Sequence, residues 1–145
     1  MAASESQKQI QIDIVCPVQG PIFSGTADMV VVPAEWGDVG IAPGHAPLLA
    51  RIEPGVVRLL SAGEDTRTYF VSGGFLEVQP HVATILADTI ERAADIDEAA
   101  AEKARESARA SLREAHDRID REHAEYELAL AAARIKALET ARKGY

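Results

Sequence analysis

The hydrophobic positions of this chain follow one period in its first part and another in its second part. Ile10, Ile12 and Ile14 alternate with polar residues, which is the period of a half-buried β-strand. Further short apolar segments are each bounded by Gly, Pro, Asp or Ser. They cover residues 18–23, 27–32, 56–60, 66–71, 75–78 and 82–87. Short strands at regular spacing predict an antiparallel β-sandwich or barrel.

The second part has the pattern of helices. All seven prolines and nine of the ten glycines lie at or before residue 80, and residues 81–143 contain neither. Asp95 or Asp97 can cap a helix N-terminus, and Gly144 can end a helix. Two alanine-rich stripes at helical spacing are predicted to face inward. They are Ala100, Ala104, Ala108 and Leu112, and Tyr126, Leu130, Ala133 and Ala137.

A helical hairpin is a better prediction for this second part than one long helix. A continuous helix over residues 97–142 would extend roughly 70 Å at about 1.5 Å per residue, which is long for a rod on a small domain. Poor helix formers place a turn near residues 114–120. Opposite charges four residues apart across that turn, such as Glu114 with Arg118, also favour a continuous helix. The sequence therefore permits both states.

Together these patterns predict an α+β protein that is mainly β in its N-terminal part. An antiparallel β-sandwich domain is expected over residues 1–92, and a C-terminal two-helix hairpin over residues 93–145. At 145 residues, with 47% of them hydrophobic, the chain is long enough to bury a core of this kind.

The charge balance argues against two classes of partner, which could bind only through local basic patches. The formal net charge is −8 and the pI is about 5.0, whereas binding to nucleic acid or to anionic membranes requires clustered Lys and Arg. No run reaches the roughly 18 apolar residues of a membrane-spanning helix, and the polar start of the chain lacks a signal-peptide pattern. Cys16 is the single cysteine, so we expect no disulfide within the chain and a reducing compartment.

The sequence offers no group of residues typical of an enzyme. It contains no GxxxxGK(S/T) phosphate loop, and no Ser-His-Asp grouping can be assigned. His116, Asp120 and His123 share one helical face, but exposed His and Asp on a solvated helix are the ordinary case. We therefore expect no catalytic residue, no metal site and no cofactor.

Residues 37–49, with the sequence GDVGIAPGHAPLL, are the most constrained segment of the chain. Three glycines and two prolines exclude a helix and break any long strand, so we predict a rigid recognition loop. Gly44 can take the positive φ of a tight turn before His45. His45 is either structural or an interface contact, and Glu35 and Asp38 are either solvated or face a partner.

Two groups of basic residues lie on the predicted helices. Arg105, Arg109 and Arg113 form a ridge at spacing four. The second group comprises Arg134, Lys136, Arg142 and Lys143. Each group is either a solvated face or a surface that docks on carboxylates or phosphates.

Two segments resemble the signatures of a known family. Residues 37–49 and residues 72–88, the latter with the sequence SGGFLEVQPHVATILAD, are similar to the hallmarks of the epsilon subunit of bacterial F-type ATP synthases. The resemblance extends from Ile10 to about Lys143. It implies a β-sandwich followed by a two-helix domain, in a non-catalytic subunit of the central stalk of a proton-translocating synthase. Such a subunit binds the gamma subunit and the c-ring at the cytoplasmic side of the bacterial inner membrane, which it reaches only through the complex.

The resemblance also implies roles for particular residues. Glu35, Asp38 and Val39 fall where the family contacts the c-ring, and His45, Ala46, Pro47, Leu48 and Leu49 fall where it contacts gamma. The helices regulate the enzyme, because they permit ATP hydrolysis when folded and inhibit it when extended into the alpha/beta catalytic head. Both basic groups are expected to serve this regulation: Arg105, Arg109, Arg113, Arg134, Lys136, Arg142 and Lys143.

Some members of the family bind ATP through a motif that begins with Ile or Leu and continues DxxRA. Here residues 96–101 read IDEAAA, so Ala100 replaces the arginine that would contact phosphate. Asp97, Arg105 and Arg134 are the remaining candidates for an ATP site.

An alternative interpretation belongs to another class of protein. It is a stand-alone β-sandwich binding module whose helical hairpin drives oligomerisation. Such a module would self-associate through its helices, whereas the stalk subunit would be monomeric alone.

Overall fold

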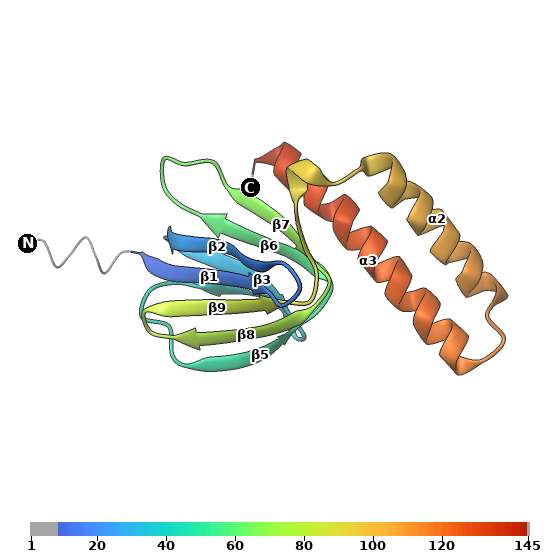
Figure 1. The fold of residues 1–145 in the computed structure, drawn as a ribbon, viewed down its shortest axis with the longest axis horizontal. Helices are drawn as coiled ribbons and strands as arrows, with labels where there is room; N and C mark the ends of the chain where they lie inside the picture. The colour runs from blue at the N-terminus through green and yellow to red at the C-terminus, as the bar shows by residue number, and fades with distance from the viewer. Residues whose placement is uncertain (1–8, 145) are drawn as a thin grey trace, which may run out of the picture.

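The computed structural model describes residues 9–144, which form one curled sheet followed by two helices (Figure 1). The strands are β1 (Ile10–Cys16), β2 (Gly20–Ala27), β3 (Met29–Ala34), β4 (Gly37–Ile41), β5 (Leu48–Ile52), β6 (Gly55–Leu60), β7 (Arg67–Val71), β8 (Gly74–Gln79), β9 (Val82–Ala87) and β10 (Ile90–Arg92). A short 3-10 helix, η1 (Ala93–Asp95), leads into α2 (Glu98–Glu114) and α3 (Arg118–Lys143). This order confirms the predicted α+β class, a strand-rich part followed by a helical hairpin.

The sheet has two halves that meet at one corner. Its strand order is β10-β7-β6-β3-β5-β8-β9-β1-β2, with β4 paired to β3. Strands β3 and β5 share a single residue pair, Ala34 with Ile52, so the sheet folds over at that point. All described strand pairs are antiparallel except β1 with β9. The folded sheet encloses the core between its halves, as expected for a β-sandwich.

The alternation of residue types along the strands places large aliphatic side chains inside. In β1, Ile10, Ile12 and Ile14 are fully buried, whereas the residues between them are only half-buried. The backbones pack so closely at one point that only glycine fits. A Cβ on Gly74, where φ is +140°, would lie 1.9 Å from the carbonyl oxygen of Leu86.

Segment 37–49 is only partly a loop, which corrects the prediction from its glycines and prolines. Its first residues form β4, which pairs with β3, and its last two residues begin β5. Short strands are compatible with glycine when a neighbouring strand supplies the hydrogen bonds. Between the strands Gly44 has φ +83°, which confirms the predicted left-handed turn. Strand β2 begins at Gly20, later than the predicted segment 18–23, because residues 17–19 form a turn.

The two helices have the predicted turn and the predicted caps at Asp97 and Gly144, and Asp117 provides a further cap that was not predicted. The side chain of Asp97 accepts a hydrogen bond from the backbone N–H of Ala100, and Asp117 accepts one from Asp120. Residues 115–117 separate α2 from α3, which confirms the hairpin. Gly144 ends α3 in a left-handed conformation.

The predicted inward stripe of α2 is wrong in its first half. Ala100 and Ala104 are exposed, whereas Ala101 and Ala108 are buried. A row of residues at spacing four drifts around a helix of about 3.6 residues per turn, so it cannot stay on one seam. The seven-residue spacing of Ala101 and Ala108 keeps both alanines against α3.

The hairpin packs on the outer side of one half of the sheet. Helix α3 lies against β6, β7 and η1 (Figure 1). A second, smaller core fills this contact. Its buried members are Val56, Phe70, Ala93, Ile96, Ala101, Ala133, Ile135 and Ala137.

Candidate functional site

The tight turn between β3 and β4 carries the residues expected to contact the c-ring. Ala34 pairs with Gly37, so Glu35 and Trp36 form the tip of a hairpin in which Gly37 has φ +119°. Glu35 and Asp38 are exposed, whereas Val39 is half-buried and packs against the sandwich core. Trp36 is also exposed and was missed by sequence reasoning. A single Trp beside Gly37 in a short turn is a signal that could have found it.

The segment expected to contact gamma is held by backbone hydrogen bonds. The N–H of Gly44 donates to the carbonyl oxygen of Pro80 over 2.9 Å, and that of His45 donates to Ala42 over 3.2 Å. The His45 ring is half-buried, and its Nδ1 lies 2.7 Å from the carbonyl oxygen of Ala46. These contacts fix the shape of the turn before any partner binds.

The remaining residues of this segment point to different sides. Ala46 and Pro47 are exposed at the start of β5. Leu48 packs against the sandwich core, whereas Leu49 points outward, because successive side chains of a strand face opposite sides. Leu49 is therefore the large apolar side chain that this segment offers to a partner.

Leu49 belongs to a larger apolar face that sequence reasoning did not identify. Phe75 on β8 is directly opposite Leu86 on β9, which is in turn opposite Val15 on β1. Leu49, Phe75 and Leu86 are 72%, 51% and 44% exposed. Adjacent apolar residues in segment 72–88, such as Phe75 and Leu76, could have indicated this face. Successive side chains of a strand face opposite sides, so one residue of each such pair must face outward. We call Leu49, Phe75, Leu86 and Val15 the apolar face.

A groove of about 310 Å³ separates α3 from the turns at one end of the sandwich. It brings together two residues from different predicted sites: Asp38, expected at the c-ring, and Lys136, expected in regulation. Glu53 lines the same groove. The hairpin thus lies beside the β3–β4 turn.

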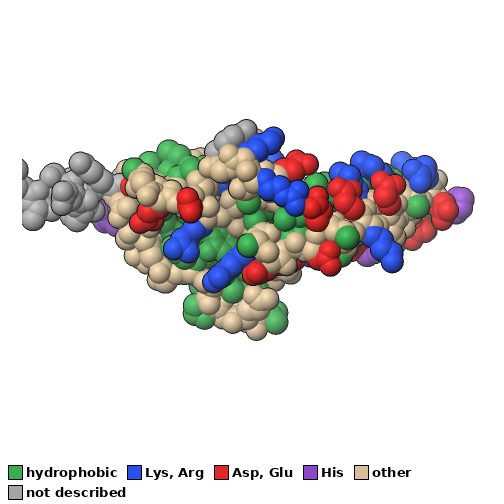
Figure 2. Space-filling model, turned by 90° about the horizontal axis from the view of Figure 1, so that it is seen from above, with side chains coloured by type: hydrophobic (Ala, Val, Ile, Leu, Met, Phe, Trp, Pro, Cys, Tyr) green, Lys and Arg blue, Asp and Glu red, His purple; other side chains and the backbone are tan. Residues whose placement is uncertain are grey.

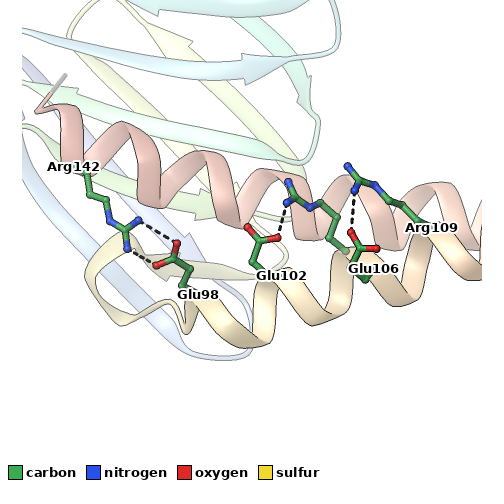
Figure 3. Close-up of polar contacts among 6 residues, drawn as sticks. Glu98, Glu102, Glu106, Arg109 and Arg142 are labelled. Carbon is green, nitrogen blue, oxygen red and sulfur yellow. Dashed lines mark hydrogen bonds and ion pairs between the residues drawn. The ribbon is translucent and has the colours of Figure 1, made fainter.

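Three of the seven basic residues expected in regulation, Arg105, Arg109 and Arg142, are paired within the hairpin. Arg105 contacts Glu102 over 2.5 Å, and Arg109 contacts Glu106 over 2.9 Å, each within α2 (Figure 3). Acidic and basic side chains alternate along the helices (Figure 2). Within residues 9–144, no carboxylate lies within 4.0 Å of Arg113, Lys136 or Lys143. These three cations therefore remain available to other anionic groups.

Arg142 joins the two helices at the open end of the hairpin. Its guanidinium contacts both carboxylate oxygens of Glu98, over 3.2 and 2.5 Å (Figure 3). These hydrogen bonds, with the attraction between the charges, lower the pKa of Glu98 below its ordinary value and raise the pKa of Arg142. The pair fastens the end of α3 to the start of α2.

Arg134 joins α3 to the sandwich. Its Nε donates to Oε1 of Glu91 over 2.8 Å, and the centre of its guanidinium lies 4.5 Å from the centroid of the Phe70 ring. The three ATP candidates are thus all engaged, since Asp97 caps α2 and Arg105 contacts Glu102. Ala100 is exposed and provides no charge.

Two kinds of feature are absent from residues 9–144. No three His, Cys, Asp or Glu side chains lie close enough together to hold a metal ion. Among the described residues, no helix is long and apolar enough to cross a membrane.

Solved structures with the same fold come from ATP synthases. A chain in the cryo-EM structure of the Euglena gracilis mitochondrial ATP synthase, OSCP/F1/c-ring, superposes with a TM-score of 0.81 at 23% identity, covering 90% of this chain and 82% of that one. A chain in the Tetrahymena thermophila mitochondrial ATP synthase, central stalk/c-ring, gives a TM-score of 0.60 at 13% identity, covering 91% and 98%. At these identities the likeness establishes the fold alone.

Sequence comparison is more specific. The family model for the ATP synthase delta/epsilon chain β-sandwich domain matches residues 9–93, and the model for its long α-helix domain matches residues 94–139. The ATP synthase epsilon chain of Nitrosococcus oceani is 49% identical over 134 residues, which are 92% of this chain and 95% of that one. The epsilon chain of Halorhodospira halophila is 50% identical over 135 residues, with the same coverage. The chain therefore belongs to the ATP synthase delta/epsilon family, as one of its epsilon chains.

Proposed function

We propose that this chain is a non-catalytic central-stalk subunit that couples gamma to the c-ring in a proton-translocating F-type ATP synthase. The observation that carries the proposal is the pair of exposed surfaces on one rigid sandwich, the apolar face and the β3–β4 turn. They lie on different strands, so two partners can be held at once. Membership of the epsilon chains favours this reading over a stand-alone oligomerising module. The subunit would lie at the cytoplasmic side of the bacterial inner membrane, which it would reach only through the complex.

Gamma is the proposed partner of the apolar face and of the turn at His45. A partner that buries Leu49 and Phe75 gains apolar contact, and the preformed turn lowers the ordering cost of binding. The double variant Gly44→Val with His45→Ala is expected to weaken gamma binding while the sandwich stays folded. Gly63→Val is the matched control, because Gly63 has a similar positive φ in a turn remote in sequence. Equal affinity of the double variant and the control for gamma, measured by titration, would contradict this assignment.

The c-ring is the proposed partner of the β3–β4 turn. Glu35 and Asp38 offer exposed carboxylates that flank the exposed Trp36 in the sequence, a combination suited to basic and polar groups of a partner loop. Asp38→Lys is expected to weaken attachment of the subunit to the c-ring and to leave gamma binding unchanged. Loss of both interactions would instead indicate a folding defect.

We also propose that the hairpin inhibits ATP hydrolysis when it leaves the sandwich and extends into the alpha/beta head. The support is the alanine-rich docking surface and the set of basic residues, of which Arg113, Lys136 and Lys143 are already free of ion pairs among the described residues. Extension would free Arg134 and Arg142 from Glu91 and Glu98. The guanidinium groups of both arginines could then bind carboxylates of the head.

Removal of the hairpin tests this inhibitory role. Truncation after Arg92 is expected to leave a folded sandwich that binds gamma, and to raise ATP hydrolysis by the assembled enzyme. Because truncation exposes Val56 and Phe70, the truncated protein is first checked for a monomeric state. Hydrolysis no faster than that of the intact complex, across a range of ADP concentrations, would refute the inhibitory role.

Binding of ATP to the isolated chain is expected to be weak. Ala100 stands where a phosphate-binding arginine would be, and Arg134 and Arg105 each contact a carboxylate that ATP would have to displace. Calorimetry on the isolated protein measures this directly. A dissociation constant in the low micromolar range, unchanged by Ala100→Arg, would contradict the expectation.

A further inference from the structure

We propose that Arg134, Glu91 and Phe70 form a latch that sets how readily the hairpin leaves the sandwich. The latch is a regulatory contact for the switch described under the proposed function, and its value for inhibition rests on that function. The effect of the latch on undocking does not rest on that function, because undocking is measurable in the isolated chain.

The latch is built from two adjacent strands and one helix. Glu91 on β10 is directly opposite Phe70 on β7, so the two side chains are neighbours on the face that meets α3. One guanidinium contacts both, with its Nε 2.8 Å from the Glu91 carboxylate and its centre 4.5 Å from the Phe70 ring centroid. A single cation on α3 therefore holds the helix to two strands.

Partial burial makes this contact stronger than an ordinary surface pair. The side chains of Arg134 and Glu91 are 29% and 32% exposed, and Phe70 is fully buried. Reduced solvent weakens the screening of opposite charges and increases the attraction of a cation to an aromatic ring. Removal of Glu91 also leaves Arg134 half-buried without its anion, which is costly.

The other ion pairs cannot hold the hairpin to the sandwich. Arg105 with Glu102, Arg109 with Glu106, and Arg118 with Glu122 each lie within one helix. The pair of Arg142 with Glu98 joins α2 to α3. Across residues 9–144, the pair of Arg134 with Glu91 is the one ion pair that links the hairpin to the sandwich.

Undocking and opening of the hairpin are therefore separate steps. Undocking breaks the latch and the small core around Phe70, but it leaves the pair of Arg142 with Glu98 intact. Opening into an extended helix then breaks that second pair. Extension of α3 into the catalytic head would carry Arg134 away from Glu91 on β10, so release from the latch precedes any use of Arg134 there.

Thiol labelling of the isolated full chain tests the latch. Ala137→Cys places a thiol in the docking surface, where Ala137 is fully buried, while Cys16 in the sandwich core reports global opening. Because only the undocked state exposes the introduced thiol, its labelling rate follows the undocked fraction. Adding Glu91→Gln is expected to raise this rate about tenfold with no change at Cys16.

Two further variants keep the test decisive. Glu106→Gln is the matched control, because it removes the same charge from a pair within α2, and it should change the rate less than about twofold. Phe70→Leu keeps an apolar side chain but removes the ring, and it is also expected to speed labelling at the introduced thiol. If neither Glu91→Gln nor Phe70→Leu speeds labelling beyond the control, the latch is wrong.

The assembled synthase then separates the latch from its proposed use. Glu91→Gln is expected to lower ATP hydrolysis several-fold, because it frees the inhibitory hairpin although Glu91 lies on the sandwich. Faster labelling together with unchanged hydrolysis supports the latch and counts against the inhibitory role. Unchanged labelling overturns the latch whatever the hydrolysis rate.

Discussion

The buried core of the sandwich and that of the hairpin are built from side chains of different size. The sandwich core is built largely from Ile, Val and Leu, whereas the hairpin buries mostly alanine. Fully buried large residues of the sandwich include Ile10, Ile12, Ile14, Val30, Val32, Val57, Leu76, Val78 and Ile85. The buried residues of α2 and α3 are Ala101, Ala108, Ala124, Ala131, Ala133, Ile135 and Ala137.

This difference in size divides stability between the two parts. Burial contributes about 0.8 kcal/mol per CH₂ group, so each large aliphatic residue contributes far more than an alanine. The sandwich can fold on its own core, whereas the docked hairpin depends on close helix contact, a few larger side chains and the contacts of Arg134. A hairpin that is docked by so few large side chains can be released from the sandwich while the sandwich stays folded.

The largest expected effect is in the sandwich. Leu76→Ala removes a fully buried side chain and should lower the free energy of unfolding by about 3 kcal/mol. Chemical denaturation followed by circular dichroism measures this change. The hairpin should melt in the same transition, because its docking surface is part of the sheet. A loss below about 1 kcal/mol would show that the sandwich core is less tightly packed than its burial indicates.

A substitution in the docking surface should affect the hairpin alone. Ala137 is fully buried, so Ala137→Leu overfills the contact and is expected to destabilise docking by about 2 kcal/mol. Ala104→Leu is the control, because Ala104 is exposed on α2. Hydrogen exchange measured by segment should quicken in α3 and stay unchanged in β1 and β8. Equal changes in all three segments would mean that the two parts unfold as one unit.

Substitution of an exposed apolar residue should affect gamma binding in the sandwich but not in the hairpin. Phe75→Ala on the apolar face is expected to weaken binding to gamma about tenfold, or about 1.4 kcal/mol, without lowering the melting temperature. Ile119→Ala, at the exposed tip of the hairpin, should leave gamma affinity unchanged. A larger loss for Ile119→Ala than for Phe75→Ala, in the same titration, would assign gamma to the hairpin instead of the sandwich.

Local rules recovered most of the elements because those elements follow their periods closely. The alternating isoleucines of β1, the cap at Asp97 and the stop at Gly144 were each readable without tertiary contacts. Strands β4, β5 and β10 were missed. Strand β4 contains two glycines and β10 has three residues, so neighbouring strands, not local preference, hold them in place.

The functional surfaces were harder to predict from the sequence than the fold. The apolar face depends on strand register, because Leu49, Phe75 and Leu86 come from three different strands, β5, β8 and β9. The contact of Arg134 with Glu91 spans 43 residues and was not predicted, although both charges were visible in the sequence. Pairing across such a separation follows from the way α3 crosses β7, which no local pattern specifies.

The smallest expected effect is at the pair of Glu98 with Arg142, within the hairpin. Hydrogen bonds from Arg142 lower the folded-state pKa of Glu98 below its ordinary value of 4.5. The pair therefore stabilises the hairpin above pH 4.5, and this contribution is lost as the pH falls through the lowered pKa. The Arg142 and Glu98 side chains are 59% and 50% exposed, so water and salt screen the attraction and the effect should be small.

A double-mutant cycle isolates this pair from the helix-dipole effect of Glu98 at the start of α2. Thermal melts of the full chain, Glu98→Gln, Arg142→Gln and the double variant should give a small favourable coupling at neutral pH. The coupling should vanish below the lowered pKa, where Glu98 is protonated, and at high salt. A coupling that persists in strong acid could not come from the charge of Glu98. Opening of the hairpin, the step that follows release of Arg134, would then not respond to ionisation of Glu98.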